Sequence, residues 1–236
     1  MKILISASNA LSKWLGVDLP RRSGVDGKGV GVQPLTTTTD TLAWQCHIVE
    51  NHYRSRHKTI IAVESYSRYT LLIPCTHRFT QDELELLILN HWLSDLLGWA
   101  EETHAVPKPV LGQLCEKVDA TDFSFQWIRN TDLSINGHVA DANHWLRDIL
   151  EQEGATQLSD ELACLLGRYI NQQFKRAKAK KGGKQRFNPV ERLIEHGFNC
   201  FVGERSNLQS KASSPVHQKL PDNVVSMAEF REKSSG

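Results

Sequence analysis

A two-residue period that begins at Leu42 constrains the fold most, because it predicts a strand with one buried face. The alternate apolar positions are Leu42, Trp44, Cys46 and Ile48. Two further β-rich runs follow at residues 59–63 and 69–73, separated by a short polar turn. These three segments predict an antiparallel meander.

Helix signals surround the predicted meander. Thr80 and Glu83 form a capping-box pair at the start of an apolar segment that extends to about Ala100. A second amphipathic segment begins at Asn136 and ends at Gly154. With short strands at residues 3–5 and 123–127, the pattern predicts an α+β fold: a small antiparallel sheet of about four strands covered by two main helices.

The segment after Gly154 predicts a basic helical hairpin. One amphipathic helix begins at Ser159 and runs past Phe174 into the basic run, and Gly182 and Gly183 stop it. Asn188 and the proline that follows it then cap a short second helix. We therefore predict an α+β domain over residues 1–154, a basic hairpin extension over 155–202 and a flexible tail over 203–236.

Composition limits the class of protein. The 236 residues are 40% hydrophobic, which is enough for a sizeable core, and 28 basic residues nearly balance 27 acidic ones. No uninterrupted apolar stretch reaches membrane-spanning length, and the N-terminus does not resemble a secretory signal. Five widely spaced cysteines fit neither a disulfide framework nor a zinc cluster. We expect a cytoplasmic protein with no membrane contact, no metal and no cofactor.

Segregated positive charge is the strongest functional signal. Residues 168–192 hold nine Lys or Arg residues and one acid. Basic side chains neutralise phosphates, and interleaved aromatic rings stack on unpaired bases, so the segment predicts contact with RNA or DNA. The alternative is a helix C-terminus enriched in cations that runs into a solvated linker. The candidate residues are Lys175, Arg176, Lys178, Lys180, Lys181, Lys184 and Arg186, with Phe174 and Phe187 as stacking partners.

A second basic segment lies in the turn at residues 51–58. A histidine there would act as general base and an arginine would stabilise a phosphorane, which is the chemistry of a metal-independent ribonuclease. The alternative is a solvated hairpin tip. The catalytic candidates are His52, Arg54, Arg56 and His57.

Other chemical signals are weaker. His138 and Asp141, and likewise Asp141 and His144, are three residues apart on a predicted helix, which permits either an acid–base pair or ordinary surface histidines. The glycines at residues 27–31 lack the context of a phosphate-binding loop.

The C-terminal tail contains one apolar island at residues 223–231. It predicts a short docking segment for a protein partner, with packing onto its own chain as the alternative. Its apolar residues are Val224, Val225, Met227 and Phe230.

Residues 1–150 also resemble an uncharacterised prokaryotic domain family of unknown function. The resemblance rests on the opening strand with Leu11 and Leu15, on Trp44, on the basic turn, and on residues 67–74 and 130–137. The family more often has an Arg-Ser-Val-Leu-Gly type of sequence where this chain has residues 130–137. The resemblance implies no activity, and it does not extend to the basic hairpin or the tail.

The sequence thus predicts a cytoplasmic, non-enzymatic, nucleic-acid-associated protein, with a mobile element or a defence or toxin–antitoxin locus as its setting. One alternative is the metal-independent ribonuclease or a nucleotide-acting toxin centred on the 51–58 turn. The other is a protein–protein adaptor that acts through the tail.

Overall fold

The computed structural model describes residues 1–24, 29–178 and 183–203. A five-stranded mixed sheet lies at its centre, with the order β4-β3-β2-β1-β5. The strands are β1 (Lys2–Ala7), β2 (Thr41–Glu50), β3 (Lys58–Glu64), β4 (Thr70–Cys75) and β5 (Ser124–Arg129). The α+β class is confirmed.

Strand direction corrects the predicted sheet. β2, β3 and β4 form the predicted antiparallel meander, but β1 lies between β2 and β5 and is parallel to both. The prediction of an antiparallel sheet of about four strands is therefore wrong for β1 and β5. The reason is physical: residue alternation reports which side chains are buried, and it carries no information about the direction of a neighbouring strand.

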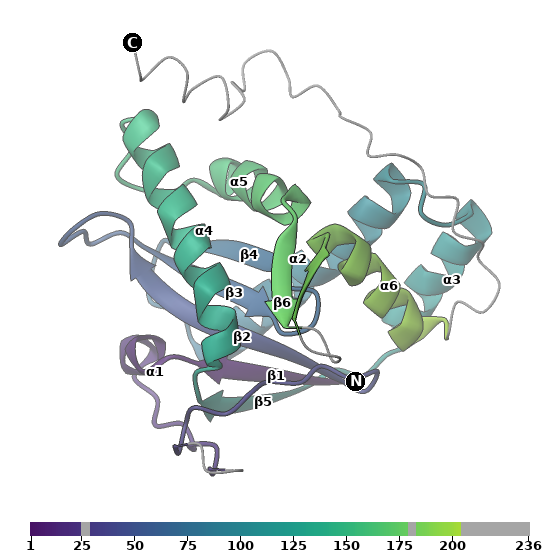
Figure 1. The fold of residues 1–236 in the computed structure, drawn as a ribbon, viewed down its shortest axis with the longest axis horizontal. Coiled ribbons are helices and arrows are strands. Elements are labelled where there is room, and N and C mark those ends of the chain that lie inside the picture. Colours follow the sequence, from purple (N-terminus) through teal and green to yellow (C-terminus); the bar gives the residue numbers. More distant parts are fainter. Residues whose placement is uncertain (25–28, 179–182, 204–236) are drawn as a thin grey trace. The chain divides into compact units, whose positions relative to one another are not determined.

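Helices cover both faces of the sheet (Figure 1). One core cluster packs Ile5, Trp44 and Ile60 against α1 (Asn9–Leu15), α2 (Gln81–Glu102), α3 (Lys108–Asp119) and α6 (Pro189–Phe201). The other packs Ile61 and Val63 against α4 (Leu133–Gln152) and α5 (Asp160–Gln172). The two predicted main helices correspond to α2 and α4, and they lie on opposite faces. None of the described helices has the length and apolar character needed to cross a bilayer.

Local capping signals were reliable. Thr80 Oγ1 accepts from Glu83 N–H at 3.2 Å, and Glu83 Oε2 accepts from Thr80 N–H at 2.7 Å, so the capping box of α2 is confirmed. Asn188 caps α6 as predicted. The sequence analysis missed α3, because Pro107 and Pro109 resemble loop residues. Both prolines lie at the start of the helix, where their missing N–H groups are tolerated.

The basic segment is not a helical hairpin. α5 ends at Gln172, and the segment that follows forms an antiparallel strand pair, β6 (Lys175–Lys178) and β7 (Lys184–Phe187). Lys, Arg and Ala all favour helix, so local propensity predicted the wrong state. Contacts distant in sequence override it here, because Lys175 bonds to the start of β4 and Phe187 is buried.

α5 and α6 both belong to the core rather than to an appendage. α5 contributes Leu166 and Ile170 to one cluster, and α6 contributes Leu193 and Phe198 to the other. α6 approaches α2 so closely that a Cβ on Gly197 would lie 2.5 Å from both methyl groups of Leu96. The β6–β7 pair therefore connects two helices that pack on opposite faces of the same sheet.

A buried asparagine holds the long loop that precedes β2. Asn130 Oδ1 accepts from Gln33 N–H at 2.7 Å, and Asn130 Nδ2 donates to the Gln33 carbonyl at 2.8 Å. Ser6 Oγ donates to the Asn130 carbonyl at 3.0 Å. The polar stretch at residues 130–137 thus fixes a loop that is about 100 residues away in sequence.

We predict that Asn130→Ala lowers the free energy of unfolding by about 2–4 kcal/mol, because it removes two buried hydrogen bonds to the backbone of Gln33. Urea denaturation measures this loss. Leu133→Ala is the control, since Leu133 is 68% exposed and its truncation should change stability by less than about 0.5 kcal/mol. A loss for Asn130→Ala no larger than that of the control would contradict this role.

Candidate nucleic-acid interface

The outer face of the β6–β7 pair presents two arginines side by side. Arg176 pairs directly with Arg186 across the ladder, and both residues are exposed. The guanidinium carbon of Arg186 lies 4.2 Å from the ring centroid of Phe174, whose own exposure is 51%. One face of the pair therefore combines two positive charges with an accessible aromatic ring.

Like charges at directly opposed strand positions repel each other. Arg176 and Arg186 form no ion pair with any carboxylate in the described part of the chain. Two positions further along the ladder, Lys178 pairs with Lys184, which adds another basic pair to the sequence of these strands. A polyanion that lies along this face would relieve the repulsion. Without a ligand, the repulsion between the two arginines only lowers the stability of the folded chain.

The inner face of the same pair anchors it to the sheet. Lys175 pairs with Phe187 in the ladder, so the two share a face. Phe187 is 7% exposed, and the guanidinium carbon of Arg192 lies 3.6 Å from its ring centroid. Lys175 Nζ donates to the Arg68 carbonyl at 2.7 Å and to Thr70 Oγ1 at 2.9 Å.

Two of the predicted nucleic-acid residues are thus turned inward. Phe187 is a core residue whose ring is covered, and Lys175 is engaged below the outer face. Arg176, Arg186 and Phe174 are the predicted contacts that the structure presents outward. Lys180 and Lys181 lie outside the described residues, as do Val224, Val225, Met227 and Phe230 of the predicted docking segment.

The other basic turn, at residues 51–58, is not assembled as a catalytic group. His52 Nε2 lies 2.8 Å from the Ala155 carbonyl. Arg54 lies over the neighbouring Tyr53 ring at 5.1 Å, and Arg56 is exposed. His57 donates its backbone N–H to Ser55 Oγ at 3.0 Å. The described contacts bring none of the four candidates together.

The predicted histidine pairs on α4 also differ from expectation. His144 Nε2 lies 3.3 Å from Asp148 Oδ2, so its acidic partner is one turn onward rather than Asp141. His138 instead faces the anchored lysine. Burial, together with the charges of Lys175 and Arg68, lowers the pKa of His138 to about 4.

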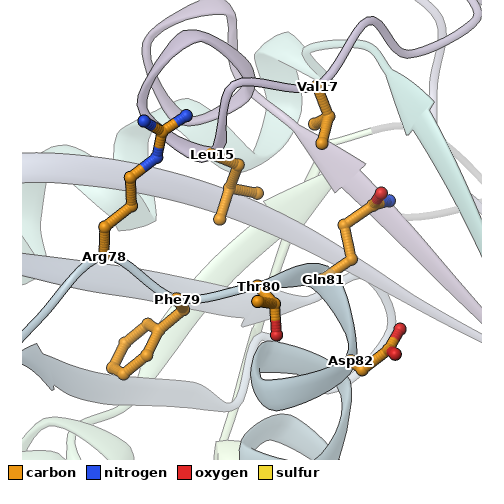
Figure 2. Close-up of a pocket in the computed structure, with 7 residues that line it drawn as sticks. All are labelled: Leu15, Val17, Arg78, Phe79, Thr80, Gln81 and Asp82. Carbon is orange, nitrogen blue, oxygen red and sulfur yellow. The ribbon is translucent and has the colours of Figure 1, made fainter.

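An open cavity of about 450 Å³ lies between the end of α1 and the start of α2 (Figure 2). In Figure 2 the Arg78 and Asp82 side chains lie at opposite ends of its lining, and Leu15 and Phe79 supply its apolar wall. Thr80 is occupied by the cap of α2. The convergent polar groups of a ligand site are not present in this lining. Within residues 1–24, 29–178 and 183–203, no cluster of three His, Cys, Asp or Glu side chains can hold a metal ion.

The sequence analysis missed Arg68, which receives the lysine anchor on its carbonyl. Its backbone is in the left-handed region with φ of 60°, and its side chain is 9% exposed. An arginine in a β-turn is ordinarily solvated, so no local pattern predicts this burial. The available signal was its place inside a β-rich apolar region whose only other charged residue is Glu64.

We predict that Lys175 makes stability rise with pH between pH 7 and about 10.5. Burial, reinforced by the Arg68 charge and opposed by Asp141, lowers the pKa of Lys175 from its usual 10.5 to about 7. In that window the unfolded chain holds a proton on this amine that the folded chain has lost, so the free energy of unfolding increases with pH. Below about pH 7 both states are protonated and the contribution is constant.

The measurement is urea denaturation of wild type and Lys175→Met at several pH values. Their difference in unfolding free energy should grow with pH by at most about 1.4 kcal/mol per pH unit. Lys108→Met, which removes an exposed lysine, is the control and should track wild type. Parallel curves for wild type and Lys175→Met would refute the shifted pKa.

Comparisons of this chain with protein-family models, with curated proteins and with solved structures find no match. The resemblance of residues 1–150 to a domain family therefore stays a prediction, and function has to be argued from the geometry of the chain itself.

Proposed function

We propose that this protein binds single-stranded nucleic acid, RNA or DNA, through the outer face of the β6–β7 pair. The observation that carries the proposal is the exposed, directly opposed pair Arg176 and Arg186, which has no carboxylate partner in the described chain and lies beside the exposed ring of Phe174. The two guanidinium groups contact phosphates, and Phe174 stacks on a base. The role is binding and not catalysis.

The charge distribution supports a local interface. The whole chain has a formal net charge of +1, so its overall field does not attract a polyanion. The basic residues concentrated on the β6–β7 segment must supply the attraction. Because phosphate contacts release counterions, binding of this kind weakens steeply with salt.

The Arg186–Phe174 arrangement favours single strands over duplexes. Unpaired bases can stack on an exposed ring or on a guanidinium plane, whereas the bases of a duplex are already stacked. The proposal is therefore binding that tolerates many sequences.

The ribonuclease alternative has less support. It needs a histidine and an arginine at one point, and the described contacts direct His52 to the Ala155 carbonyl and Arg54 to the Tyr53 ring. We therefore propose one function. The adaptor alternative depends on tail residues that lie outside the described chain.

We predict that Arg176→Gln combined with Arg186→Gln weakens binding to a single-stranded oligonucleotide by at least about tenfold at low salt. The slope of log affinity against log salt should fall by about 1.4, since each lost single-strand phosphate contact contributes about 0.7. Fluorescence anisotropy over a salt series measures both quantities.

The matched control is Lys108→Gln combined with Lys117→Gln. This pair removes the same charge from exposed positions on α3. It should leave affinity and slope nearly unchanged. Equal losses from the two double variants would mean that only net charge matters, and absence of wild-type binding would end the proposal.

We also predict that Phe174→Ala reduces affinity by about 1–3 kcal/mol, the usual value of one stacked base, with little change in salt slope. Phe174→Trp should retain binding. Leu165→Ala is the control, because Leu165 lies on α5 with a similar exposure of 50%. An unchanged affinity for Phe174→Ala would remove base stacking from the proposal.

A further inference from the structure

Beneath the β6–β7 pair, Arg68 has hydrogen-bonding capacity that the fold does not use. Its Nη2 donates to Ser134 Oγ at 3.2 Å, but its Nε and Nη1 are buried and have no hydrogen-bond partner in the described chain. Leaving buried charged donors unpaired is costly, and such groups in native proteins call for a missing partner. A planar guanidinium with two free N–H groups is suited to an oxyanion.

The nearest carboxylates do not fill this role. Glu64 and Asp132 are close enough to favour the charged form of Arg68. However, Glu64 Oε2 accepts from the N–H and hydroxyl of Ser67 at 2.5 and 2.6 Å, and Asp132 Oδ1 accepts from Ser134 N–H at 2.8 Å. Asp132 Oδ2 also accepts from Leu35 N–H, and Glu64 Oε1 also accepts from the Thr37 hydroxyl, so both carboxylates have other donors and neither has a hydrogen bond to the guanidinium in the described chain.

Two further basic groups converge on the same point. Lys175 donates to the Arg68 carbonyl, and His138 on α4 lies close enough to be affected by the charges of both Arg68 and Lys175. Arg192 adds positive charge from the side of α6, and Asp141 is the acidic group that faces Lys175. Three separate elements, the β3–β4 turn, α4 and β6, thus bring basic side chains together.

We propose that Arg68, Lys175, His138 and Ser134 form a binding site for a phosphate group. The guanidinium and the amine carry the charge, Ser134 adds a hydroxyl at the exposed edge, and the imidazole completes the set of donors once it is protonated. A carboxylate is planar and a sulfonate carries only one negative charge. A phosphate group is tetrahedral and can carry two, which suits basic groups that approach from separate elements.

Entry to the site involves the β6–β7 pair. The free nitrogens of Arg68 are shielded from solvent, so neighbouring side chains must move to admit a ligand. Lys175 is one of these neighbours, and it lies on β6. To bind a ligand, its amine must give up its hydrogen bonds to the Arg68 carbonyl and to Thr70 Oγ1. Phosphate in this site therefore replaces a carbonyl and a hydroxyl as the partner of the Lys175 amine.

The site and the outer face use different side chains, so the inference does not depend on the proposed function. The phosphate could belong to a small phosphorylated molecule or to the 5′ end of a nucleic-acid strand. Both sources present the same chemistry, and the experiment distinguishes them.

The first measurement is an NMR titration of the His138 ring with inorganic phosphate, against sodium chloride of equal ionic strength. Bound phosphate, which carries one negative charge at this pH, stabilises the imidazolium, so the pKa of His138 should rise from about 4 by at least about one unit, a tenfold change in proton affinity. Lys175→Met and Ser134→Ala should each reduce the phosphate response. Arg176→Gln combined with Arg186→Gln should preserve it.

Arg68→Lys keeps the charge and removes the fork of donors, so it should weaken phosphate binding at least about tenfold. Because that variant changes a buried residue, Ser134→Ala at the exposed edge provides the test if Arg68→Lys fails to fold. The same His138 response in wild type with phosphate and with chloride would overturn the inference. So would a phosphate response that survives in both Lys175→Met and Ser134→Ala.

The second measurement compares a 5′-phosphorylated oligonucleotide with its 5′-hydroxyl counterpart. Tighter binding of the phosphorylated strand by about tenfold in wild type, lost in Lys175→Met, assigns the site to strand ends. Equal binding of the two strands, with the inorganic phosphate response intact, assigns it to a small phosphorylated molecule. Arg176→Gln combined with Arg186→Gln should lose oligonucleotide binding and keep phosphate binding. That result shows that this site and the proposed interface are separate.

Discussion

The carboxamide of Asn171 fixes the end of α5 to the edge strand β4. Its Oδ1 accepts from Thr70 N–H and its Nδ2 donates to the Thr70 carbonyl, both at 2.8 Å, so the side chain acts as a strand partner for the first residue of β4. β4 is an edge strand, and exposed edges leave backbone groups unpaired. This contact joins the end of α5 to the sheet edge, and the β6–β7 pair begins three residues after Gln172.

That junction explains the two-sided character of the β6–β7 pair. With the end of α5 fixed at Thr70, Lys175 reaches the adjacent hydroxyl and the Arg68 carbonyl, and its ladder partner Phe187 is buried with it. The next positions, Arg176 and Arg186, must then face solvent because alternate residues of a strand point to opposite sides. The register of β6 against β7 thus places Lys175 on the inner face and Arg176 and Arg186 on the outer face. The inner residue belongs to the proposed phosphate site, and the outer residues belong to the proposed nucleic-acid interface.

The two proposed sites would bind their ligands with different dependence on salt. The outer arginines are exposed, and their mutual repulsion is screened by salt, so any ligand there gains mainly from counterion release. The Arg68 guanidinium and the Lys175 amine are shielded from water. In such a buried environment an unpaired donor raises the free energy of the folded state more, and dissolved salt screens charges less. A ligand at the inner site would be held by a few directed hydrogen bonds, and one at the outer face by charge and stacking.

Much of the scaffold could be predicted from sequence. The caps at Thr80 and Asn188 and the alternation along β2 are set by residues within one or two turns of each other, so they could be read directly. α3 was missed because its N-terminal prolines carry the same local signal as a loop. Of the proposed interface, the sequence identified the basic segment and Phe174 but also included Phe187, whose burial depends on Arg192 and the core around it.

The sequence by itself determined the amphipathic helices, the meander and the concentration of basic charge, because these depend on neighbouring residues. Only the tertiary structure decided that β1 and β5 run parallel, that residues 175–178 and 184–187 form strands, and that Lys175 turns inward. Lys175 bonds to groups 105 and 107 residues away, and such contacts outweigh the helix propensity of the basic run. A local pattern cannot encode a partner that only folding brings within reach.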